Sequence, residues 1–299
     1  MKKLITKFSL FILLLSSIIV LSFIVISKII NEKASFKLHK PVGSIVLGNS
    51  HSEFALNDSI ITDFTNVSQS GESYFYTYIK LKEIVKDNPQ IQTVFLAFSN
   101  EVIDVGMNEW TWGDQYISFR FPEFAPFMDF RQHYILACNN PKSYIENLSK
   151  SIKKNSGKIF KNDYLFINDH IGAFKNLNQS AEDSEGTKEK PTQTNKVELS
   201  LVNLANLDKI VDFCEEKRIN LFFIRCPLNP KYPGYYNESE LKHLLQTRYS
   251  SIQFLDFAKF PLEYADYFDL EHLNFNGSKK FSLWFETFKN TELQKKMTN

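Results

Sequence analysis

The sequence has few of the residues that build disulfide frameworks, phosphate loops and metal centres. Its three cysteines, Cys138, Cys214 and Cys226, are irregularly spaced, so we expect buried thiols rather than a disulfide framework or a metal site. No glycine-rich phosphate loop is present, and no group of His, Cys and acidic residues has metal-ligand spacing. The sequence therefore predicts a protein without a bound metal or cofactor.

A strong excess of either charge is also missing. The first 28 residues hold four of the 35 basic residues and none of the 34 acidic ones, which leaves 31 basic against 34 acidic residues, a net charge of −3. A nucleic-acid-binding domain usually presents a basic face. The charge balance therefore argues against a nucleic-acid partner.

One long apolar run is present, at the start of the chain. Phe8–Ser27 is uncharged and consists almost entirely of Leu, Ile, Val, Phe and Ser, long enough to span a hydrocarbon core of about 30 Å. A cleaved signal peptide is the alternative, but no A-x-A-like cleavage site follows the run. We therefore predict a cytoplasmic tail over residues 1–7 and an uncleaved transmembrane signal anchor over residues 8–28.

The side of the membrane on which the rest of the chain lies is set only weakly by charge. Lysines before the span nearly balance those after it, at positions 2, 3 and 7 against 28, 33, 37 and 40. The positive-inside rule is therefore almost neutral here. On the commoner arrangement of such anchors, we expect a single-pass membrane protein with its domain on the extracytoplasmic side.

Residues 29–299 are long enough for one sizeable α/β domain with a buried core. Short apolar runs predict strands at residues 45–47, 66–68, 93–98, 221–224 and 252–257. Helical periodicity lies between or after them, at residues 75–88, 199–217 and 278–290. Strands that alternate with helices predict a mostly parallel sheet covered on both faces, in three α/β/α layers.

Two regions do not fit this alternation. Residues 101–175 are rich in Trp, Tyr and Phe and look irregular, so we interpret them as an insertion or cap over the carboxyl edge of the sheet. Residues 176–196 contain almost no apolar side chain. Such a segment cannot bury enough surface to offset its ordering entropy, which predicts a mobile loop.

The first predicted strand runs directly into Gly48-Asn49-Ser50. A serine here lies at the carboxyl end of a strand, where open α/β sheets keep their chemistry. The alternative is structural, because Ser50 and Glu53 also fit the Ser-x-x-Glu capping box of a helix.

Four more residues are predicted to lie at the same edge of the sheet. Gly71 follows the second strand, Asn100 follows the third, and Asp269 and His272 precede the final helix. His272 could remove the proton of Ser50, with Asp269 fixing its tautomer and stabilising its charged form. Gly71 and Asn100 could donate a backbone N–H and a side-chain amide to an oxyanion, each contributing about 3 kcal/mol.

These four blocks resemble those of the SGNH/GDSL hydrolase superfamily. Gly48-Asn49-Ser50 is similar to its Gly-Asp-Ser block, Asn66–Gly71 to its glycine block, Ser99-Asn100-Glu101 to its Gly-Thr-Asn-Asp block, and Asp269–His272 to its Asp-x-x-His. The resemblance implies a flavodoxin-like fold and activity on esters, often acetyl esters of carbohydrate. The anchor implies a cell-envelope member that moves acyl groups on polysaccharides. Its partners would be an acylated carbohydrate and a multipass membrane acyltransferase.

The sequence departs from the family pattern at three positions. Asn49 and Glu101 replace aspartates, and Phe98 stands where the third block usually has glycine. A bulky residue cannot copy a glycine backbone, so Phe98 puts the loop that carries Asn100 in question.

Several other polar residues compete for roles in the site. Ser52 is a second potential nucleophile and Asp266 a second potential carboxylate. We interpret His51 as a rim residue, the pair Asp169-His170 as surface, and Glu72 and Glu101 as solvated.

Three functions remain open. The first is an esterase or O-acyltransferase with an acyl-serine intermediate, and the second is an inactive relative that binds glycan or serves as a scaffold. The third is a membrane-anchored structural protein in which Ser50 is a helix cap.

Overall fold

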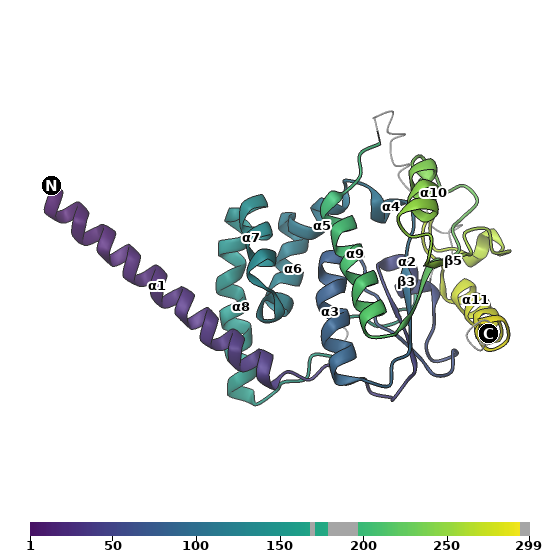
Figure 1. Cartoon of the computed structure of the whole chain (residues 1–299), viewed down its shortest axis with the longest axis horizontal. Coiled ribbons are helices and arrows are strands. Elements are labelled where there is room, and N and C mark those ends of the chain that lie inside the picture. The colour runs from purple at the N-terminus through teal and green to yellow at the C-terminus, as the bar shows by residue number, and fades with distance from the viewer. Residues whose placement is uncertain (168–170, 179–196, 294–299) are drawn as a thin grey trace. The chain divides into compact units, whose positions relative to one another are not determined.

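The computed structural model describes residues 1–167, 171–178 and 197–293. The chain divides into two compact units (Figure 1). The helical unit contains Met1–Ser35 and Trp112–Phe166, and the sheet unit contains Phe36–Thr111 and Ile167–Asn299. From residue 179 onward the predicted mobile loop lies outside the described residues, as does the pair Asp169-His170.

The sheet unit is built on five parallel strands, as the sequence predicted. They are β1 (Ser44–Leu47), β2 (Phe64–Asn66), β3 (Thr93–Ala97), β4 (Asn220–Arg225) and β5 (Gln253–Asp256). Their spatial order is β2-β1-β3-β4-β5, and every neighbouring pair is parallel. This is the flavodoxin-like order, in which the switch point lies between β1 and β3.

Helices cover both faces of this sheet. Val46, Phe95 and Phe222 pack on one face with Phe281 and Phe285 of α11 (Phe275–Phe288). The residues between them along each strand point to the other face, where α3 (Tyr74–Asp87) and α9 (Leu201–Glu216) lie side by side (Figure 1). The predicted α/β/α layering is therefore confirmed, and α3 ends at the predicted stop before Pro89.

Shorter elements complete the sheet unit. They are α2 (Ser50–Ala55), α4 (Asn100–Ile103), α5 (Met107–Trp112, ending at the boundary between the units), α10 (Glu238–Thr247), the 3-10 turn η2 (Tyr264–Asp266) and the π-helical turn η3 (Lys289–Leu293). α2 begins where β1 ends and α4 begins where β3 ends. The two turns that flank the switch point therefore each open into a helix.

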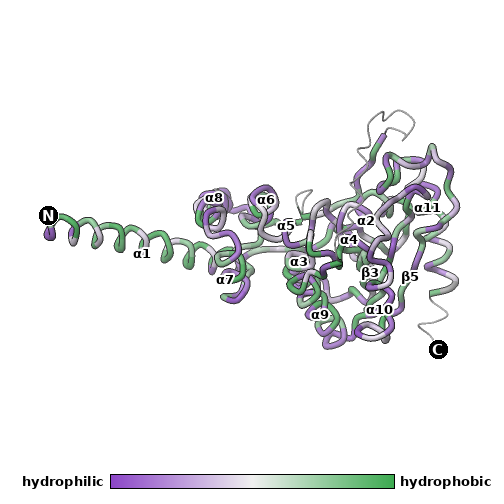
Figure 2. The backbone as a smooth tube through the Cα atoms, turned by 90° about the horizontal axis from the view of Figure 1, so that it is seen from above, coloured by the Kyte–Doolittle hydropathy of each residue, from purple (hydrophilic) through white to green (hydrophobic). Residues whose placement is uncertain are grey.

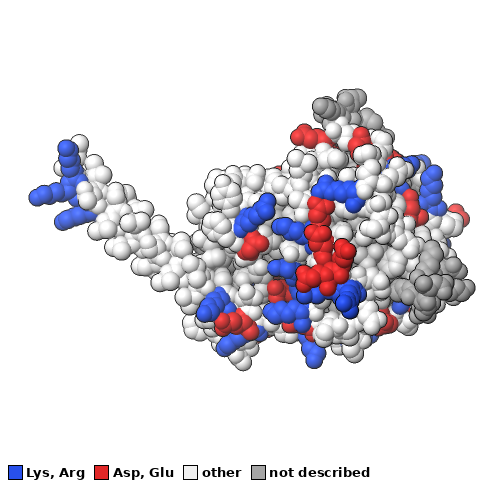
Figure 3. Space-filling view, viewed as in Figure 1, with Lys and Arg blue, Asp and Glu red and all other residues white. Residues whose placement is uncertain are grey.

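The helical unit begins with α1 (Lys2–Lys33), which is about 48 Å long at 1.5 Å per residue. Among the described residues it is the one helix long and apolar enough to cross a membrane, with a mean hydropathy of 2.9 over its most apolar stretch. Lysines stand at its free end, and the exposed stretch that follows carries no charge (Figures 2 and 3). Packing starts near Phe23, whose ring meets that of His133 edge to face at 5.4 Å.

The remaining helices of this unit are α6 (Asp114–Phe124), the 3-10 turn η1 (Ala125–Phe127), α7 (Phe130–Asn139) and α8 (Pro141–Lys161). The expectation of an irregular aromatic region was therefore wrong over most of its length. The fully buried positions of α8 are small polar residues, and its apolar Tyr144, Leu148 and Ile152 lie half-buried beside them; the buried positions are Ser143, Asn147, Ser151 and Asn155. That the region caps the sheet edge stays a prediction.

All three cysteines are free thiols, as predicted, but they are not all buried. Cys214 and Cys226 are buried, whereas Cys138 is exposed on α7. Burial raises the pKa of the Cys214 thiol to about 12. The thiol of Cys214 is therefore protonated and unreactive at neutral pH.

Candidate active site

The turn between β1 and α2 positions Ser50. Gly48 has φ = +147°, and a Cβ there would lie 2.3 Å from the Cβ of Ala97, so only glycine lets this turn approach β3 so closely. Asn49 caps α2, its side chain accepting a hydrogen bond from the N–H of His51 at 3.1 Å. The capping alternative for Ser50 was therefore wrong, because Asn49 is the N-cap and Ser50 is the first residue of the helix.

Two hydrogen bonds connect Ser50 to Asp269 through His272. Nε2 of His272 lies 2.8 Å from Oγ of Ser50, and Nδ1 lies 2.8 Å from Oδ2 of Asp269. A carboxylate can only accept, so Nδ1 is the protonated ring nitrogen and Nε2 accepts the serine proton. The structure thus brings these three predicted residues together across 222 positions of sequence between Ser50 and His272.

Asp269 and His272 lie on a loop whose shape is fixed by its own backbone. Oδ1 of Asp269 accepts the N–H groups of Glu271 at 2.7 Å and of His272 at 2.8 Å. At the end of the loop, a Cβ on Gly277 would lie 2.2 Å from the carbonyl oxygen of Asp266. Glycine at this position therefore lets α11 start directly against the loop that carries the histidine.

The surroundings of Asp269 favour its charged form. Burial raises the pKa of this carboxyl group, but the hydrogen bond from His272, the charge of that ring and the two backbone N–H groups outweigh burial and lower the pKa below its ordinary value. Asp269 is therefore ionised at neutral pH, as an acid that stabilises an imidazolium must be.

α2 supplies the rings that flank His272. Phe54 meets the His272 ring edge to face at 5.3 Å, and His51 does so at 5.6 Å. His51 is buried rather than a rim residue, so that interpretation was wrong. The same helix therefore carries the serine and the two rings that hold the base in place.

Glu101 connects the turn after β3 to the turn after β1. It accepts hydrogen bonds from Nδ2 of Asn49 at 2.8 Å and from Oγ of Ser99 at 2.6 Å, and it lies 3.2 Å from Nδ1 of His51. The expectation that Glu101 is solvated was therefore wrong. Sequence reasoning missed this contact because Asn49 and Glu101 are 52 residues apart and neither lies in a periodic pattern.

The glycine loop is fastened to the Ser50 turn. Gly71 has φ = +65°, a left-handed conformation that favours glycine. The buried Glu53 accepts the N–H of Ser70 at 2.7 Å, and the N–H of Gln69 is donated to the carbonyl of Gly48 at 2.9 Å. No described residue accepts a hydrogen bond from the N–H of Gly71, which leaves this group available to a ligand.

The side-chain amide of Asn100 already forms hydrogen bonds with other residues. Its Nδ2 donates to Asn237 at 2.9 Å and to Glu238 at 3.0 Å, and its Oδ1 accepts from Arg225 at 3.0 Å. Phe98 packs flat against Phe223 at 4.7 Å, in place of the glycine of the family pattern. The predicted oxyanion role of the Asn100 amide is therefore not supported by this arrangement, because both amide hydrogens already have acceptors.

The competing residues have structural contacts. Ser52 is fully buried and donates to Oγ of Ser68 at 2.8 Å. Glu72 is fully buried and pairs with Lys80 at 2.7 Å, which corrects the expectation that it is solvated.

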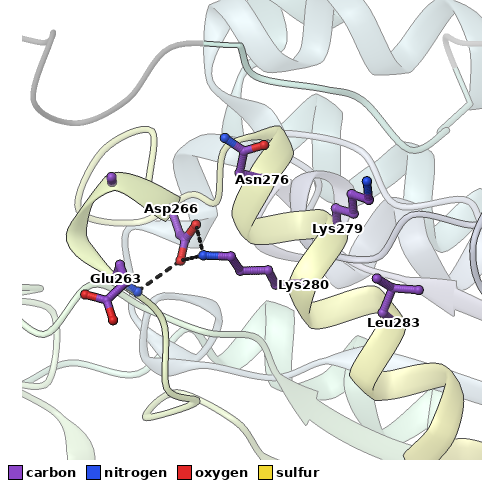
Figure 4. Close-up of a pocket in the computed structure, with 7 residues that line it drawn as sticks. Glu263, Asp266, Asn276, Lys279, Lys280 and Leu283 are labelled. Atoms are coloured by element: carbon purple, nitrogen blue, oxygen red, sulfur yellow. Dashed lines mark hydrogen bonds and ion pairs between the residues drawn. The ribbon is translucent and has the colours of Figure 1, made fainter.

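Asp266 binds Lys280 at 2.7 Å rather than a histidine, beside a hollow of about 540 Å³ (Figure 4). None of Ser50, Asp269 and His272 is among the residues that line this hollow.

Comparisons with known proteins add little to this geometry. A protein-family model without a functional description matches residues 172–294. No curated protein matches the chain in sequence. Among solved structures, a Bacteroides fragilis protein named as a "putative acylhydrolase" is 11% identical, with a TM-score of 0.38 over 89% of this chain and 94% of that one. At this identity and TM-score the likeness is weak.

Proposed function

We propose that this protein is a serine acyl-ester hydrolase or O-acyltransferase of the SGNH type. The observation that carries the proposal is the pair of 2.8 Å hydrogen bonds that connects Ser50, His272 and Asp269. In these two hydrogen bonds Ser50 donates to Nε2 of His272, and Nδ1 of the same ring donates to the ionised Asp269. This direction of donation is the one that activates a serine hydroxyl.

In the first half of the reaction, Oγ of Ser50 forms a bond to the ester carbonyl carbon while Nε2 of His272 takes the serine proton. The carbonyl π electrons move to its oxygen, and Asp269 stabilises the imidazolium. Collapse of the tetrahedral species breaks the bond to the leaving alkoxide, which receives the proton from Nε2. The products are a free alcohol and an acyl-serine.

In the second half, Nε2 removes a proton from the incoming hydroxyl group, which attacks the acyl carbon. Water gives a carboxylic acid, and a sugar hydroxyl gives a new ester. In both cases the bond to Oγ of Ser50 breaks and His272 returns the proton to it. Hydrolase and transferase therefore use the same residues and differ only in the acceptor.

Donors to the oxyanion come from the backbone in this proposal. Among the described residues the N–H of Gly71 has no acceptor, and the N–H of Ser50 belongs to the first turn of α2, where N–H groups have no partner within the helix. Without the Asn100 amide the site lacks a donor of a kind that lowers barriers by about 3 kcal/mol. This loss favours the second candidate function, an inactive glycan-binding or scaffold protein.

Two departures from the family pattern compensate each other, which favours a working site. Asn49 and Glu101 each replace an aspartate, and they meet in one hydrogen bond of 2.8 Å. The turn that carries Ser50 is therefore braced by a different pair rather than left without support.

The substrate class follows from the apolar helix and from the family resemblance. We propose an acylated carbohydrate of the cell envelope as substrate, an extracytoplasmic location for the sheet unit, and a multipass membrane acyltransferase as a partner that would supply acyl groups. A hydrolase would release free acid from acetylated glycan, whereas a transferase would need the acceptor glycan present.

The decisive experiment is labelling of the full-length protein in detergent with a fluorophosphonate probe. We expect one modified residue, Ser50, identified by peptide mass spectrometry, and loss of labelling in Ser50→Ala and His272→Ala. Ser52→Ala is the matched control and should still be labelled. A folded protein that is never labelled would exclude the enzyme and leave the scaffold function.

A further inference from the structure

Two histidines and a glutamate converge beside Ser50. Ligand atoms of His51, Glu271 and His272 all lie within 4.8 Å of one another. We propose that these three side chains bind Zn²⁺ and that the bound metal inhibits acyl transfer. The inhibitory part rests on the proposed function, whereas the metal site itself does not.

The distances are close to those of a zinc site. Zinc bonds to imidazole nitrogen and carboxylate oxygen are each about 2.0–2.2 Å long, which places tetrahedral ligand atoms about 3.3–3.6 Å apart. Nε2 of His51 lies 3.8 Å from Oε2 of Glu271. Every pair of ligand atoms lies within 4.8 Å, so closing the site around a cation requires side-chain movement, to which the partly exposed Glu271 can contribute.

Both imidazoles are held as metal-binding histidines usually are. Nδ1 of His51 faces Glu101 at 3.2 Å, and Nδ1 of His272 faces Asp269 at 2.8 Å. A carboxylate at Nδ1 fixes the ring and leaves Nε2 unprotonated and more basic, the arrangement that recurs behind zinc ligands. Nε2 of His272 is thus the acceptor nitrogen of its ring, and His51 turns its own Nε2 towards Glu271.

The local charge also favours a divalent cation. Three carboxylates, from Glu101, Asp269 and Glu271, surround two imidazoles, and Oε2 of Glu271 lies 3.8 Å from Nε2 of His51. A bound Zn²⁺ would bring positive charge to all three acids at once.

Inhibition follows from competition for one atom. Nε2 of His272 accepts the proton of Ser50 at 2.8 Å, and a metal on the same nitrogen would occupy its lone pair. Ser50 would then lose its base while the fold stays intact. Removal of the metal should restore the base without any covalent change.

Binding can be measured without reference to activity. Full-length, tag-free protein in detergent, stripped with EDTA, is titrated with ZnCl₂ by isothermal calorimetry. We expect one site per chain, and a loss of at least tenfold in affinity in both His51→Ala and Glu271→Gln. His243→Ala, which removes an exposed histidine on α10, is the matched control and should bind as the parent does. Absence of stoichiometric binding, or binding unchanged in both variants, would overturn the site.

Inhibition is tested by fluorophosphonate labelling at Ser50 with and without ZnCl₂. We expect Zn²⁺ to suppress labelling and EDTA to restore it, with suppression lost in Glu271→Gln. Zinc binding without suppression would overturn the inhibitory role. If the parent binds Zn²⁺ but is never labelled, the proposed enzyme function fails while the metal site stands. Circular dichroism of each variant checks the fold.

Discussion

The helical unit and the sheet unit differ in the balance between exposed apolar and buried charged side chains. In the helical unit, large apolar residues stay exposed even away from α1, for example Phe130 at 86% and Phe160 at 90% exposure. In the sheet unit, charged residues are buried and each finds a partner, for example Lys80 with Glu72 and Arg225 with Glu238. A surface of exposed aromatic rings suits an apolar environment, whereas a fixed polar network suits chemistry that needs placed charges. We therefore expect the two units to lie in different surroundings.

The largest expected effect concerns the helical unit and whether α1 holds the protein in a membrane. If α1 is an uncleaved anchor, the full-length protein should stay in the membrane fraction through washes in high salt and at alkaline pH, because apolar burial resists both. Protease added to intact spheroplasts should digest the sheet unit. Release of full-length protein by washing would show that α1 does not span, and protection from protease would reverse the predicted orientation.

In the sheet unit, Asp269→Asn should reduce acyl transfer by about 10⁴-fold, because an amide at this position favours the wrong tautomer of His272. The fold should persist, since the loop keeps an oxygen that can accept its two backbone N–H groups. Hydrolysis of p-nitrophenyl acetate, compared with the thermal midpoint, separates the two effects. Near-normal turnover would mean that His272 needs no acid.

Lys80→Met tests how much a buried ion pair of the sheet unit contributes to stability. Lys80 and Glu72 have no exposed side-chain surface, so removing the lysine leaves a buried carboxylate without its partner. We expect a loss of about 3–5 kcal/mol in the free energy of unfolding. Lys217→Met removes an exposed lysine paired with Glu216, and should change stability by less than about 1 kcal/mol. The free energy of unfolding is measured with urea for both variants. An equal loss in the two would show that the buried ion pair matters no more to stability than the exposed one.

A smaller effect is expected from acid. The pKa of Asp256 and that of Glu238 are raised by burial but lowered further by Arg225, and the pKa of Asp269 is lowered by His272. Because the folded pKa values lie below unfolded values of about 4, the unfolded chain binds more protons in acid. The stability from these groups is therefore present above about pH 4 and is lost as pH falls through the folded pKa values.

Urea midpoints measured from pH 7 to pH 3 test this expectation. Arg225→Gln should flatten the decline, because two of the three carboxyl groups would return towards ordinary pKa values. A decline of the same steepness in that variant would assign the acid sensitivity to other groups.

The parallel sheet and the line from Ser50 to Asp269 could be predicted because each rests on local patterns, whereas the flavodoxin-like strand order was implied only by the family resemblance. Apolar runs end at Gly48 and before Asn100, and Asp269 and His272 lie three residues apart on one turn. Such signals need no knowledge of long-range contacts. Parallel strands then place all of their carboxyl ends at one edge, which turns four local motifs into one site.

The remaining contacts could not be predicted because they depend on partners distant in the sequence. Asn100 is bound by Arg225 and Asn237, more than 120 positions away. His51 faces Glu101 and Glu271, and nothing in the pattern around it distinguishes a buried ring from an exposed one. The helices of residues 114–161 were missed for a different reason, since the fully buried positions of α8 are small and polar and its apolar row, Tyr144, Leu148 and Ile152, is only half-buried beside them.

The helix α2 carries both the nucleophile and the two rings that flank the catalytic histidine, and this has a mechanical consequence. Ser50, His51 and Phe54 belong to one short helix, so a thermal displacement of that helix carries all three together. His272 is gripped between two of these rings, and it follows the helix even though it belongs to a distant loop. The 2.8 Å distance between Oγ of Ser50 and Nε2 of His272 therefore depends on α2 at both ends, because one short helix places the nucleophile and the rings beside the base.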